Sequence, residues 1–285
     1  MSFTPPSKSE FTRKDFLVIS KLLHEHTGIH MLEEKSTLIH SRLRKRIRRL
    51  GLESFRDYCA LVSSPGNDEL KHMCDALTTN VTSFFRENHH FEHLRTFVLP
   101  DLLAAARIGK KIRIWSAGCS SGEEPYSIAL TILSLMPEAF SLDIKVLATD
   151  INQEVIHAGV AGIYRAEDIA NVDRALCSKW MRPVNKRGVQ HYQLDEVVRG
   201  LVTFRLLNLA GNWPMRGSFQ VIFCRNVVIY FDSQTQIEIW NRMMPLLDLN
   251  GTIYAGHSER LIDKVALLTK CRAATTYRKT LSAAA

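Results

Sequence analysis

The sequence lacks several features that would place a chain in a special class of protein. No apolar run approaches the roughly 20 residues needed to cross a bilayer, and the opening stretch "MSFTPPSKSE" has no apolar core of a signal peptide. The six cysteines are scattered without a C-x-x-C pair, which favours reduced, mostly buried thiols over a disulfide framework or a zinc site. We therefore expect a cytoplasmic protein with no membrane insertion.

Few patterns point to a metal ion. The i,i+4 pairs His26/His30 and His89/His93 could hold an ion on one helix face, but we recognise no Glu-x-x-His or flanking carboxylate–histidine pattern that supports a metal role. We therefore expect no metal site.

Apolar residues recur at helical spacing from 11 to 108, which predicts an all-helical N-terminal part. The pattern breaks at "TTNVTSFFREN", so we expect a connecting segment at 78–88 and a helical domain with this connector at 1–87. The expected helices span 11–26, 33–50, 54–63, 68–77 and 88–108, the last bent or interrupted at Pro100.

The helix expected at 33–50 carries the densest charge feature of the chain. Ile39, Leu43, Ile47 and Leu50 form one apolar stripe, and six cations with no acid among them occupy the other faces. These cations either form a solvated helix face or bind an anionic partner, which the formal net charge of +8 favours. The six are Arg42, Arg44, Lys45, Arg46, Arg48 and Arg49.

From Lys111 onward, short apolar strands alternate with helices. This order predicts a parallel, doubly wound α/β sheet that holds a ligand at the carboxyl ends of its strands. In the interval 165–205, "WMRPVNKRGVQHYQL" and "GLVTFRLLN" both predict short strands, so we expect a small antiparallel subdomain inserted there. The expected strands are 111–116, 143–149, 219–224 and 251–255, and the helices are 124–135, 152–159 and 233–247, within a domain at 88–285.

The loop "AGCSSGEEP" after the first strand indicates which ligand the sheet holds. It lacks the G-x-G-x-x-G pattern and the lysine of phosphate-binding loops, and Glu123 and Glu124 would set like charges beside a pyrophosphate. S-adenosylmethionine has no phosphate and carries cationic groups that a carboxylate attracts. Asp150, at the end of the second strand, could accept its ribose hydroxyls. These features favour a Rossmann-like, S-adenosylmethionine-dependent methyltransferase.

Glu124 has a second possible role. Ser121 and Glu124 form an S-x-x-E pattern that could close a capping box, and a helix N-terminus favours a carboxylate in any case. The residues alone leave cofactor binding and capping both open for Glu124.

Several segments together resemble the CheR-type chemotaxis receptor methyltransferases over nearly the whole chain. They are "NVTSFFREN", "WSAGCSSGEEPYS", "ATDIN", "FRLLNL", "FCRNVVIYF" and "AGHSE". The resemblance implies an all-helical N-terminal domain, then a Rossmann-like S-adenosylmethionine-dependent domain with an inserted β-subdomain. It also implies methyl transfer from S-adenosylmethionine to glutamate side chains of chemoreceptors, with S-adenosylhomocysteine as product. Such an enzyme is cytoplasmic and is recruited to membrane receptor arrays.

The resemblance implies roles for individual residues. Arg86 is suited to the carboxylate of the methionine part through its bidentate fork, and Asp150 is suited to the ribose. Tyr230 is implied to face the transferring methyl and, with Arg225, to position the substrate. The residues implied to bind the cofactor are Asn80, Thr82, Arg86, Glu124, Asp150, Asn208, Leu209, Arg225 and Asn226.

Structural alternatives stay open for four of these residues. Thr82 could cap a helix, and Asn226 could satisfy a turn. Tyr230 could fill the core, and Arg225 could pair with a structural acid.

The implied partner is the helical cytoplasmic domain of a chemoreceptor, whose glutamates would complement the cations at 42–49. Some receptors also tether family members through a C-terminal pentapeptide that adds to the edge of the inserted sheet. The turn in "RPVNKRG" is shorter than in members that bind it, so we do not favour a pentapeptide here.

Two other classes of function stay open. The charge of +8 motivates a nucleic-acid methyltransferase, although the chain has no base-stacking module and no N/D-P-P-Y/F tetrapeptide. A non-catalytic module that senses S-adenosylmethionine is the other alternative. We favour the receptor enzyme and expect no nucleic-acid partner.

Overall fold

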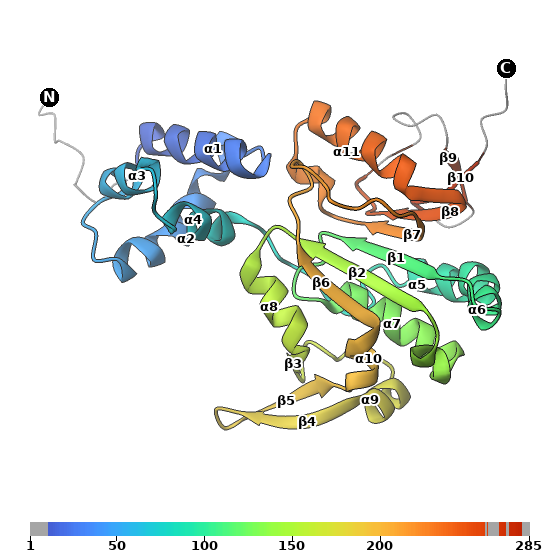
Figure 1. The fold of residues 1–285 in the computed structure, drawn as a ribbon. Helices are drawn as coiled ribbons and strands as arrows, with labels where there is room; N and C mark the ends of the chain where they lie inside the picture. Colours follow the sequence, from blue (N-terminus) through green and yellow to red (C-terminus); the bar gives the residue numbers. More distant parts are fainter. Residues whose placement is uncertain (1–10, 260, 262–267, 272–273, 281–285) are drawn as a thin grey trace, which may run out of the picture. The chain divides into compact units, whose positions relative to one another are not determined.

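The computed structural model describes residues 11–259, 261, 268–271 and 274–280, and Figure 1 shows its helices and strands. The stretch "MSFTPPSKSE" lies outside the described residues. Residue contacts divide the chain into two compact units: the first runs to Thr79 and includes Tyr230–Asp232, and the second contains Asn80–Ile229 and the residues from Ser233. The expected connector at 78–88 thus falls in the second unit from Asn80 onward. Within the described residues, no helix has the length and apolar character that a membrane crossing needs.

The first unit is all-helical, which confirms the predicted fold class of this part. Its elements are α1 (Arg13–Thr27), the 3₁₀ turn η1 (Glu33–Lys35), α2 (Ser36–Arg49), α3 (Phe55–Ser63) and α4 (Glu69–Leu77). Ile39, Leu43 and Ile47 of the predicted stripe on α2 are buried in one apolar core with side chains of the other helices. Leu50, the last residue of the predicted stripe, directly follows α2 and is 41% exposed.

The second unit is built on a seven-stranded sheet in the order β6-β2-β1-β7-β8-β10-β9. The strands are β1 (Ile112–Ala117), β2 (Ile144–Asp150), β6 (Val202–Leu206), β7 (Phe219–Cys224), β8 (Leu247–Ala255), β9 (Leu268–Lys270) and β10 (Thr276–Lys279). Five strands, from β6 to β8, are parallel, and β10 is antiparallel to both of its neighbours. The predicted parallel, doubly wound sheet is confirmed, with an antiparallel edge that the sequence did not predict.

Helices cover both faces of this sheet (Figure 1). They include α7 (Glu123–Leu135), α8 (Gln153–Ala161), α10 (Glu196–Leu201) and α11 (Ser233–Leu246). Helices α7, α8 and α10 contact β2 and β6, whereas α11 contacts β8. Because the parallel strands are joined by crossover connections, the carboxyl ends of β1, β2, β6 and β7 meet at one edge of the sheet.

The inserted subdomain is a three-stranded antiparallel sheet in the order β3-β5-β4. It contains β3 (Ile163–Arg165), α9 (Arg174–Trp180), β4 (Met181–Lys186) and β5 (Val189–Leu194). The small antiparallel subdomain is confirmed, but the assignment of "GLVTFRLLN" to it is wrong. Its strand β6 pairs in parallel with β2, from Val146↔Val202 to Asp150↔Leu206, and Val202 and Phe204 are buried in the core of the main sheet.

The helix expected at 88–108 consists of three segments. These are α5 (His89–His93), a π-helical turn (Leu94–Val98) and α6 (Leu99–Arg107). Pro100 lies in the first turn of α6, where its missing N–H is tolerated, and the wider turn directly precedes it. The predicted interruption near Pro100 is confirmed.

Candidate cofactor and active site

The loop between β1 and α7 packs closely against two other segments. Gly118 has φ of 78°, and a Cβ there would lie 2.8 Å from a methyl carbon of Val227, which follows β7. Gly122 has φ of 99°, and a Cβ there would lie 3.0 Å from the hydroxyl oxygen of Tyr164. Both positions require glycine on conformational and steric grounds. Packing against neighbouring segments therefore accounts for these two glycines.

Glu124 lies in the first turn of α7, and its carboxylate has two partners outside that helix. Oε1 accepts a hydrogen bond from Ser116 Oγ at 2.7 Å, and Oε2 accepts one from Nη1 of Arg225 at 3.1 Å. No described side chain caps α7, and the Ser121 hydroxyl donates to Glu123 instead. The capping box that Ser121 and Glu124 could have formed is therefore absent from this part of the chain.

Arg225 lies in the turn after β7 and connects three segments. It is 5% exposed, and its Nη2 donates to the carbonyl oxygen of Arg86 and lies 3.5 Å from Oε2 of Glu87. Its Cζ lies 5.6 Å from the ring centroid of Phe91. Its Nε has no hydrogen-bond partner among the described residues. Arg225 thus pairs with Glu87 and Glu124, which agrees with the alternative that it pairs with a structural acid. Its buried Nε remains an unused donor within the described residues.

The pKa values of Glu124 and Glu87, the two acids beside Arg225, are shifted in opposite directions. Burial raises the pKa of Glu124, and the Arg225 charge and the Ser116 hydrogen bond only partly oppose this shift. Burial also acts to raise the pKa of Glu87, but the Arg225 charge and a hydrogen bond to His257 outweigh it and hold that pKa below its usual range. The positive charge of Arg225 therefore lowers the pKa of both acids and favours their ionised forms.

Asp150 ends β2, and both of its carboxylate oxygens accept backbone hydrogen bonds. Oδ2 accepts from Ser120 N at 2.8 Å, and Oδ1 accepts from Asn152 N at 3.0 Å. The Ser120 hydroxyl in turn donates to the carbonyl oxygen of Asn80 at 2.9 Å. The structure thus brings Asn80 and Asp150 to the same loop. A carboxylate oxygen can accept more than one hydrogen bond, so these contacts are compatible with a bound diol.

The segment that carries Arg86 is fixed to α7. The N–H of Phe85 donates to Ser127 Oγ at 2.9 Å, and Nη1 of Arg86 donates to the carbonyl oxygen of Val81 at 2.8 Å. Together with the bond from Arg225 to its carbonyl oxygen, these contacts place Arg86 beside the start of α7. Arg86 is brought together with Glu124 and Arg225.

The same segment stores backbone strain. Phe85 and Glu87 have φ of 53° and 55°, a left-handed conformation that residues other than glycine rarely adopt. Thr82 is half-buried and caps no described helix, because α5 begins only at His89 with Asn88 before it. The capping alternative for Thr82 is therefore wrong.

Asn208 and Leu209 lie in the turn that follows β6. Oδ1 of Asn208 accepts from Ala210 N at 2.9 Å, and the carbonyl oxygen of Leu209 accepts from Nε1 of Trp213 at 3.1 Å. The N–H of Leu207, just before this turn, donates to the carbonyl oxygen of Asp150 at 2.8 Å. Both residues therefore lie at the edge of the sheet where Asp150 ends its strand.

Glu259 has no role in the sequence interpretation, although it ends the segment "AGHSE". It is 5% exposed, and its two oxygens accept hydrogen bonds from backbone N–H groups at distances from 2.7 to 3.0 Å. Its place as an acid just after a predicted buried strand is the sequence signal that could have identified Glu259. The donors are Asn226, Val227, Val228 and Gly256.

Glu259 thereby holds the turn that carries Arg225 and Asn226. Asn226 has φ of 56°, which asparagine tolerates better than most residues. Asn226 therefore does occupy a turn position, as the alternative to cofactor binding proposed.

Tyr230 belongs to the first unit, unlike the residues implied to bind the cofactor. Its carbonyl oxygen accepts from the N–H of His30 at 2.8 Å, and Nζ of Lys35 lies 5.8 Å from its ring centroid. Its side chain is half-buried. The role of Tyr230 toward a methyl group stays a prediction.

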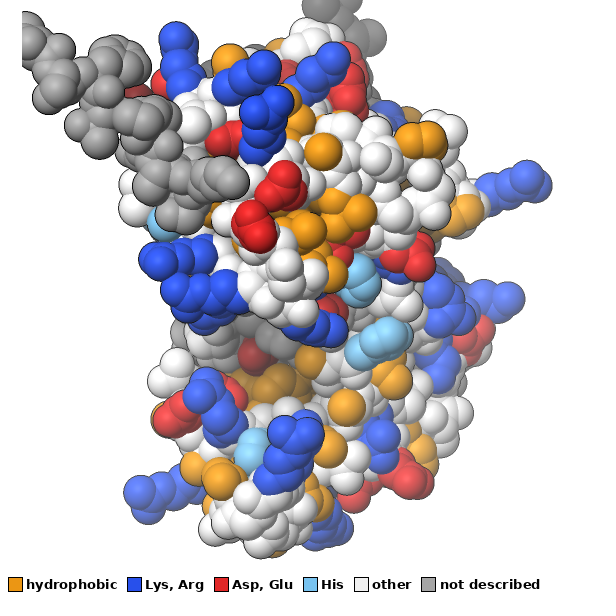
Figure 2. Space-filling view, turned by 90° about the vertical axis from the view of Figure 1, so that its left-hand side faces the viewer, with side chains coloured by type: hydrophobic (Ala, Val, Ile, Leu, Met, Phe, Trp, Pro, Cys, Tyr) orange, Lys and Arg blue, Asp and Glu red, His pale blue; other side chains and the backbone are white. Residues whose placement is uncertain are grey.

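Two of the six cations on α2 have partners inside the first unit. Nε and Nη2 of Arg46 donate to the two oxygens of Glu69 at 2.5 and 2.6 Å. Nη1 of Arg42 donates to the carbonyl oxygens of Leu77 and Thr78 at the end of α4, at 2.8 and 2.9 Å. The exposed members of the set are Arg44, Lys45, Arg48 and Arg49. Lys and Arg side chains lie in several separate groups on the face that Figure 2 shows.

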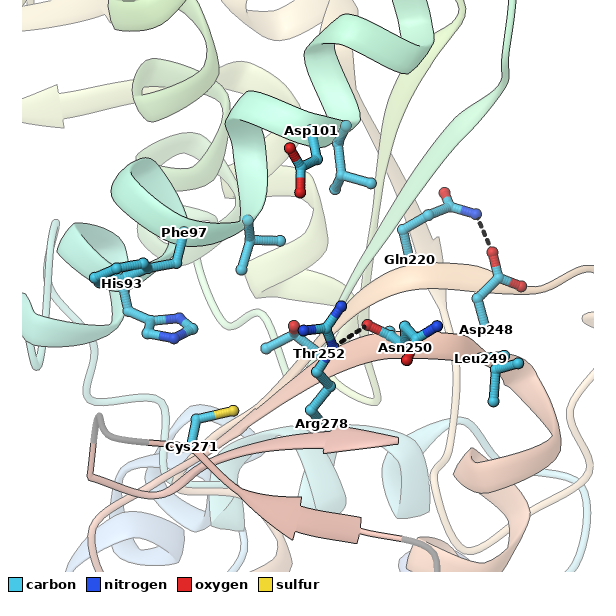
Figure 3. Close-up of a pocket in the computed structure, with 13 residues that line it drawn as sticks. His93, Phe97, Asp101, Gln220, Asp248, Leu249, Asn250, Thr252, Cys271 and Arg278 are labelled. Carbon is cyan, nitrogen blue, oxygen red and sulfur yellow. Dashed lines mark hydrogen bonds between the residues drawn. The ribbon is translucent and has the colours of Figure 1, made fainter. Parts of the chain in front are cut away.

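A cavity of about 260 Å³ lies at another part of the second unit, beside the π-helical turn (Figure 3). Gln220 at the amino end of β7 lines it, whereas Arg225 follows the carboxyl end of that strand. Arg278 borders the cavity, and its Nε donates to the carbonyl oxygen of Asn250 at 3.2 Å. None of the described residues that line this cavity is implied to bind the cofactor.

Comparisons with known proteins show the family of the chain. The family models "CheR methyltransferase, all-alpha domain" and "CheR methyltransferase, SAM binding domain" match residues 14–78 and 80–277. The chain is 49% identical over 260 residues to "Probable chemotaxis protein methyltransferase" of Rhizobium etli, covering 91% of this chain and 97% of that protein. It is 38% identical to "Chemotaxis protein methyltransferase 2" of Pseudomonas aeruginosa, covering 88% of each. It is also 38% identical to "Chemotaxis protein methyltransferase" of Escherichia coli, covering 86% of this chain and 83% of that protein. The chain belongs to the CheR methyltransferase family, and its second unit is the S-adenosylmethionine-binding domain of that family.

Proposed function

We propose that the chain is a protein-glutamate O-methyltransferase that uses S-adenosylmethionine to methylate glutamate side chains of chemoreceptors. The observation that carries this proposal is the position of two carboxylates: Glu124 lies in the first turn of the helix that follows β1, and Asp150 is the last residue of the adjacent strand β2. Glu124 does not cap its helix, so its charge suits the cationic end of the methyl donor. Asp150 suits the ribose hydroxyls, because its oxygens lie at a strand end and can accept further hydrogen bonds.

The other residues implied by the family have compatible surroundings. The unused buried Nε of Arg225 is a donor for an anionic group, and the backbone of Arg86, whose side chain is half-buried, accepts a hydrogen bond from the same guanidinium. The turn that Glu259 holds presents Asn226 at the end of β7. The residues proposed to bind the cofactor are Asn80, Thr82, Arg86, Glu124, Asp150, Asn208, Leu209, Arg225 and Asn226.

The chemistry places few demands on acid–base groups of the protein. The cofactor supplies a methyl group activated by its sulfonium. A glutamate side chain with a pKa of about 4.3 is already ionised at neutral pH and needs no general base to attack. The protein must align the carboxylate oxygen with the methyl carbon and remove water from it. We assign this positioning role to Arg225, with Tyr230 retained as a prediction from the family.

The proposed partner surface is the exposed part of the cations on α2. Arg44, Lys45, Arg48 and Arg49 are free to face a glutamate-rich receptor helix, whereas Arg42 and Arg46 are held inside the first unit. Surface charge of this kind acts mainly on association and is weakened by salt. A receptor in the membrane would recruit the enzyme to its arrays through this surface.

A receptor pentapeptide is not favoured as a second contact. Strand β4 is an outer strand of the inserted sheet, where such a peptide would add. The turn after β4 speaks against the peptide: Lys186 pairs with Val189 across only two residues, a shorter turn than in family members that bind the peptide. Titration calorimetry with such a peptide tests this point: no heat of binding is expected, and saturable binding would overturn it.

Methyl transfer to receptor-containing membranes tests the proposed function. Native chain and methyl-labelled S-adenosylmethionine should yield label on the receptor that mild base releases, because esters hydrolyse under these conditions. An Asp150→Asn variant should lose most of this transfer through weaker cofactor binding. Base-stable label on nucleic acid would identify the alternative methyltransferase. Cofactor binding without any transfer would identify the sensing module.

A further inference from the structure

Three side chains at the start of α5 form a cluster that the methyltransferase chemistry does not use. Glu87, His89 and His90 each offer one ligand atom, and these atoms lie within 4.8 Å of one another. All three belong to the second unit, and the Glu87 side chain is 14% exposed. Residues 87–90 form a Glu-x-x-His segment, which the expectation of no metal site overlooked.

His90 is held with a ring lone pair toward Glu87. It is fully buried, and its Nε2 lies 3.0 Å from the carbonyl oxygen of Ala274. A carbonyl oxygen only accepts hydrogen bonds, so Nε2 carries the proton and Nδ1 carries the lone pair. Nδ1 lies 3.7 Å from Oε2 of Glu87, and neither atom has a hydrogen-bond partner among the described residues.

The lone pair of His90 Nδ1 therefore faces Oε2 of Glu87 across a gap of 3.7 Å that no described side chain fills. A cation between the two atoms would satisfy both of them.

Two further histidines lie on the open side of this pair. The His89 ring is exposed, and its centroid lies 4.1 Å from that of His90. His257 is 73% exposed, and its Nδ1 lies 3.4 Å from Oε1 of Glu87. An ion could therefore reach the buried atoms from solvent and gain imidazole ligands at the surface.

We propose that Glu87, His89 and His90 bind a divalent transition-metal ion, with His257 as a fourth ligand, and that Zn²⁺ matches this set best. One carboxylate and several imidazoles are typical zinc ligands, whereas Ca²⁺ and Mg²⁺ require mainly oxygen ligands. The hydrogen bond from His90 Nε2 to the Ala274 carbonyl is the type of contact that orients a metal-bound histidine.

Arg225 couples this cluster to the cofactor site. Its Nη2 lies 3.5 Å from Oε2 of Glu87, and its Nη1 donates to Glu124. A divalent ion on Glu87 adds positive charge beside the guanidinium of Arg225. The two positive charges repel each other, so a bound ion disfavours the position in which Arg225 contacts Glu87 and Glu124. Zn²⁺ and S-adenosylmethionine should therefore weaken each other's binding, by the same factor in both directions. This coupling rests on the proposed function, whereas the metal site does not.

Titration of the metal-free full chain with Zn²⁺ against a chromophoric chelator tests the site directly. One ion should bind per chain, and His89→Gln should weaken binding at least roughly tenfold. Because His89 is exposed, this variant should fold normally. Glu87→Gln should weaken binding as well. The matched control His157→Gln replaces an exposed histidine on α8 and should leave binding unchanged.

A cobalt spectrum identifies the ligands of the ion. Co²⁺ in the native chain should show visible d–d bands without a thiolate charge-transfer band. Three outcomes would each overturn the proposal. They are the absence of stoichiometric binding, undiminished binding in the His89→Gln chain, and a thiolate band that places the ion on cysteines. Methyl transfer measured without added metal is a separate readout, so failure of the zinc site and failure of the proposed function are distinguishable.

Discussion

Glu124 and Arg225 are 101 positions apart in the sequence and form an ion pair with 3.1 Å between Oε2 and Nη1. Their side chains are 13% and 2% exposed, so neither charge has much access to water. Removing one member of such a pair leaves the other charge uncompensated. The pair joins the start of α7 to the turn after β7 and therefore couples two parts of the proposed cofactor site.

Glu124→Gln should weaken S-adenosylmethionine binding by at least about tenfold, which corresponds to about 1.4 kcal/mol. Glutamine can keep a hydrogen bond with Ser116, but it removes the negative charge that attracts the donor and that compensates Arg225. Titration calorimetry with the cofactor measures this change.

The matched control for this substitution is Glu154→Gln. Glu154 is an exposed residue in the first turn of α8, so its replacement should leave cofactor affinity unchanged. Native affinity in the Glu124→Gln chain would show that Glu124 serves only to hold Arg225 in place.

Cofactor affinity should also depend on pH through Glu124. Because burial raises the pKa of Glu124, this side chain gains a proton at a higher pH than an exposed glutamate does. Binding that needs the charged form is present above this raised pKa and is lost as pH falls through it. Titrations at decreasing pH should show this loss in the native chain and a flatter profile in Glu124→Gln. Parallel profiles would contradict the assignment.

Glu259→Gln should lower both stability and cofactor affinity. Each oxygen of Glu259 accepts two backbone N–H groups, and the amide nitrogen of glutamine would face two of these donors without accepting from them. An unsatisfied buried donor costs about 1–3 kcal/mol, so the melting temperature should fall by at least about 4 °C. Thermal unfolding monitored by circular dichroism measures this. Glu196→Gln, at a 93% exposed side chain, should melt like the native chain, and equal melting of both variants would contradict the role of Glu259.

Features with a local signal could be predicted from the sequence. Helical spacing placed Ile39, Leu43 and Ile47 in the core of the first unit, and short apolar runs placed most strands of the parallel sheet. Asp150 could be placed at a strand end because strand alternation and the position of an acid are both visible in a short stretch.

Pairings between distant segments could not be predicted. Nothing near Arg225 indicates that Glu124 and Glu87 are its partners, and nothing near Glu259 indicates that it binds the turn after β7. Strand β6 has an apolar pattern that fits either sheet, and only its parallel pairing with β2 decides between them. These contacts depend on packing in three dimensions, which a single sequence does not display.

Glu69→Gln should destabilise the first unit in a pH-dependent way. Burial acts to raise the pKa of Glu69, but the hydrogen bonds from Arg46 and Tyr58 outweigh it and hold that pKa below its usual value. A carboxylate with a lowered folded-state pKa stabilises the fold above its unfolded pKa of about 4.3, and this stability is lost as pH falls through the folded pKa. The variant should lose about 3 kcal/mol at neutral pH, with a smaller difference from the native chain in acid. Chemical unfolding at both pH values measures this.

Cofactor titration is the control for Glu69→Gln, since Arg46 and Tyr58, which donate to its carboxylate, lie in the first unit. Its affinity for S-adenosylmethionine should equal that of the native chain. An equal loss of stability at neutral and acid pH would contradict the electrostatic origin of the effect.

Reversal of two exposed charges on α2, Arg44→Glu with Arg48→Glu, should lower receptor methylation while leaving cofactor affinity unchanged. Exposed pairs contribute about 0.2–1 kcal/mol each, so loss of attraction and gain of repulsion at two sites should reduce kcat/KM for receptor roughly tenfold at low salt. The deficit should shrink as salt rises, because surface charges are screened. Methylation of receptor membranes over a range of salt concentrations measures both effects.

The matched control reverses two exposed cations elsewhere in the first unit, Lys14→Glu with Arg56→Glu. Both double variants change the net charge equally, so a surface role for α2 requires that only the α2 variant loses activity. Equal losses in the two variants would assign the effect to net charge. Arg46 is unsuitable for this test because it is paired with Glu69, and its reversal would place a buried acid beside that carboxylate. The comparison therefore separates receptor contact from both global charge and folding.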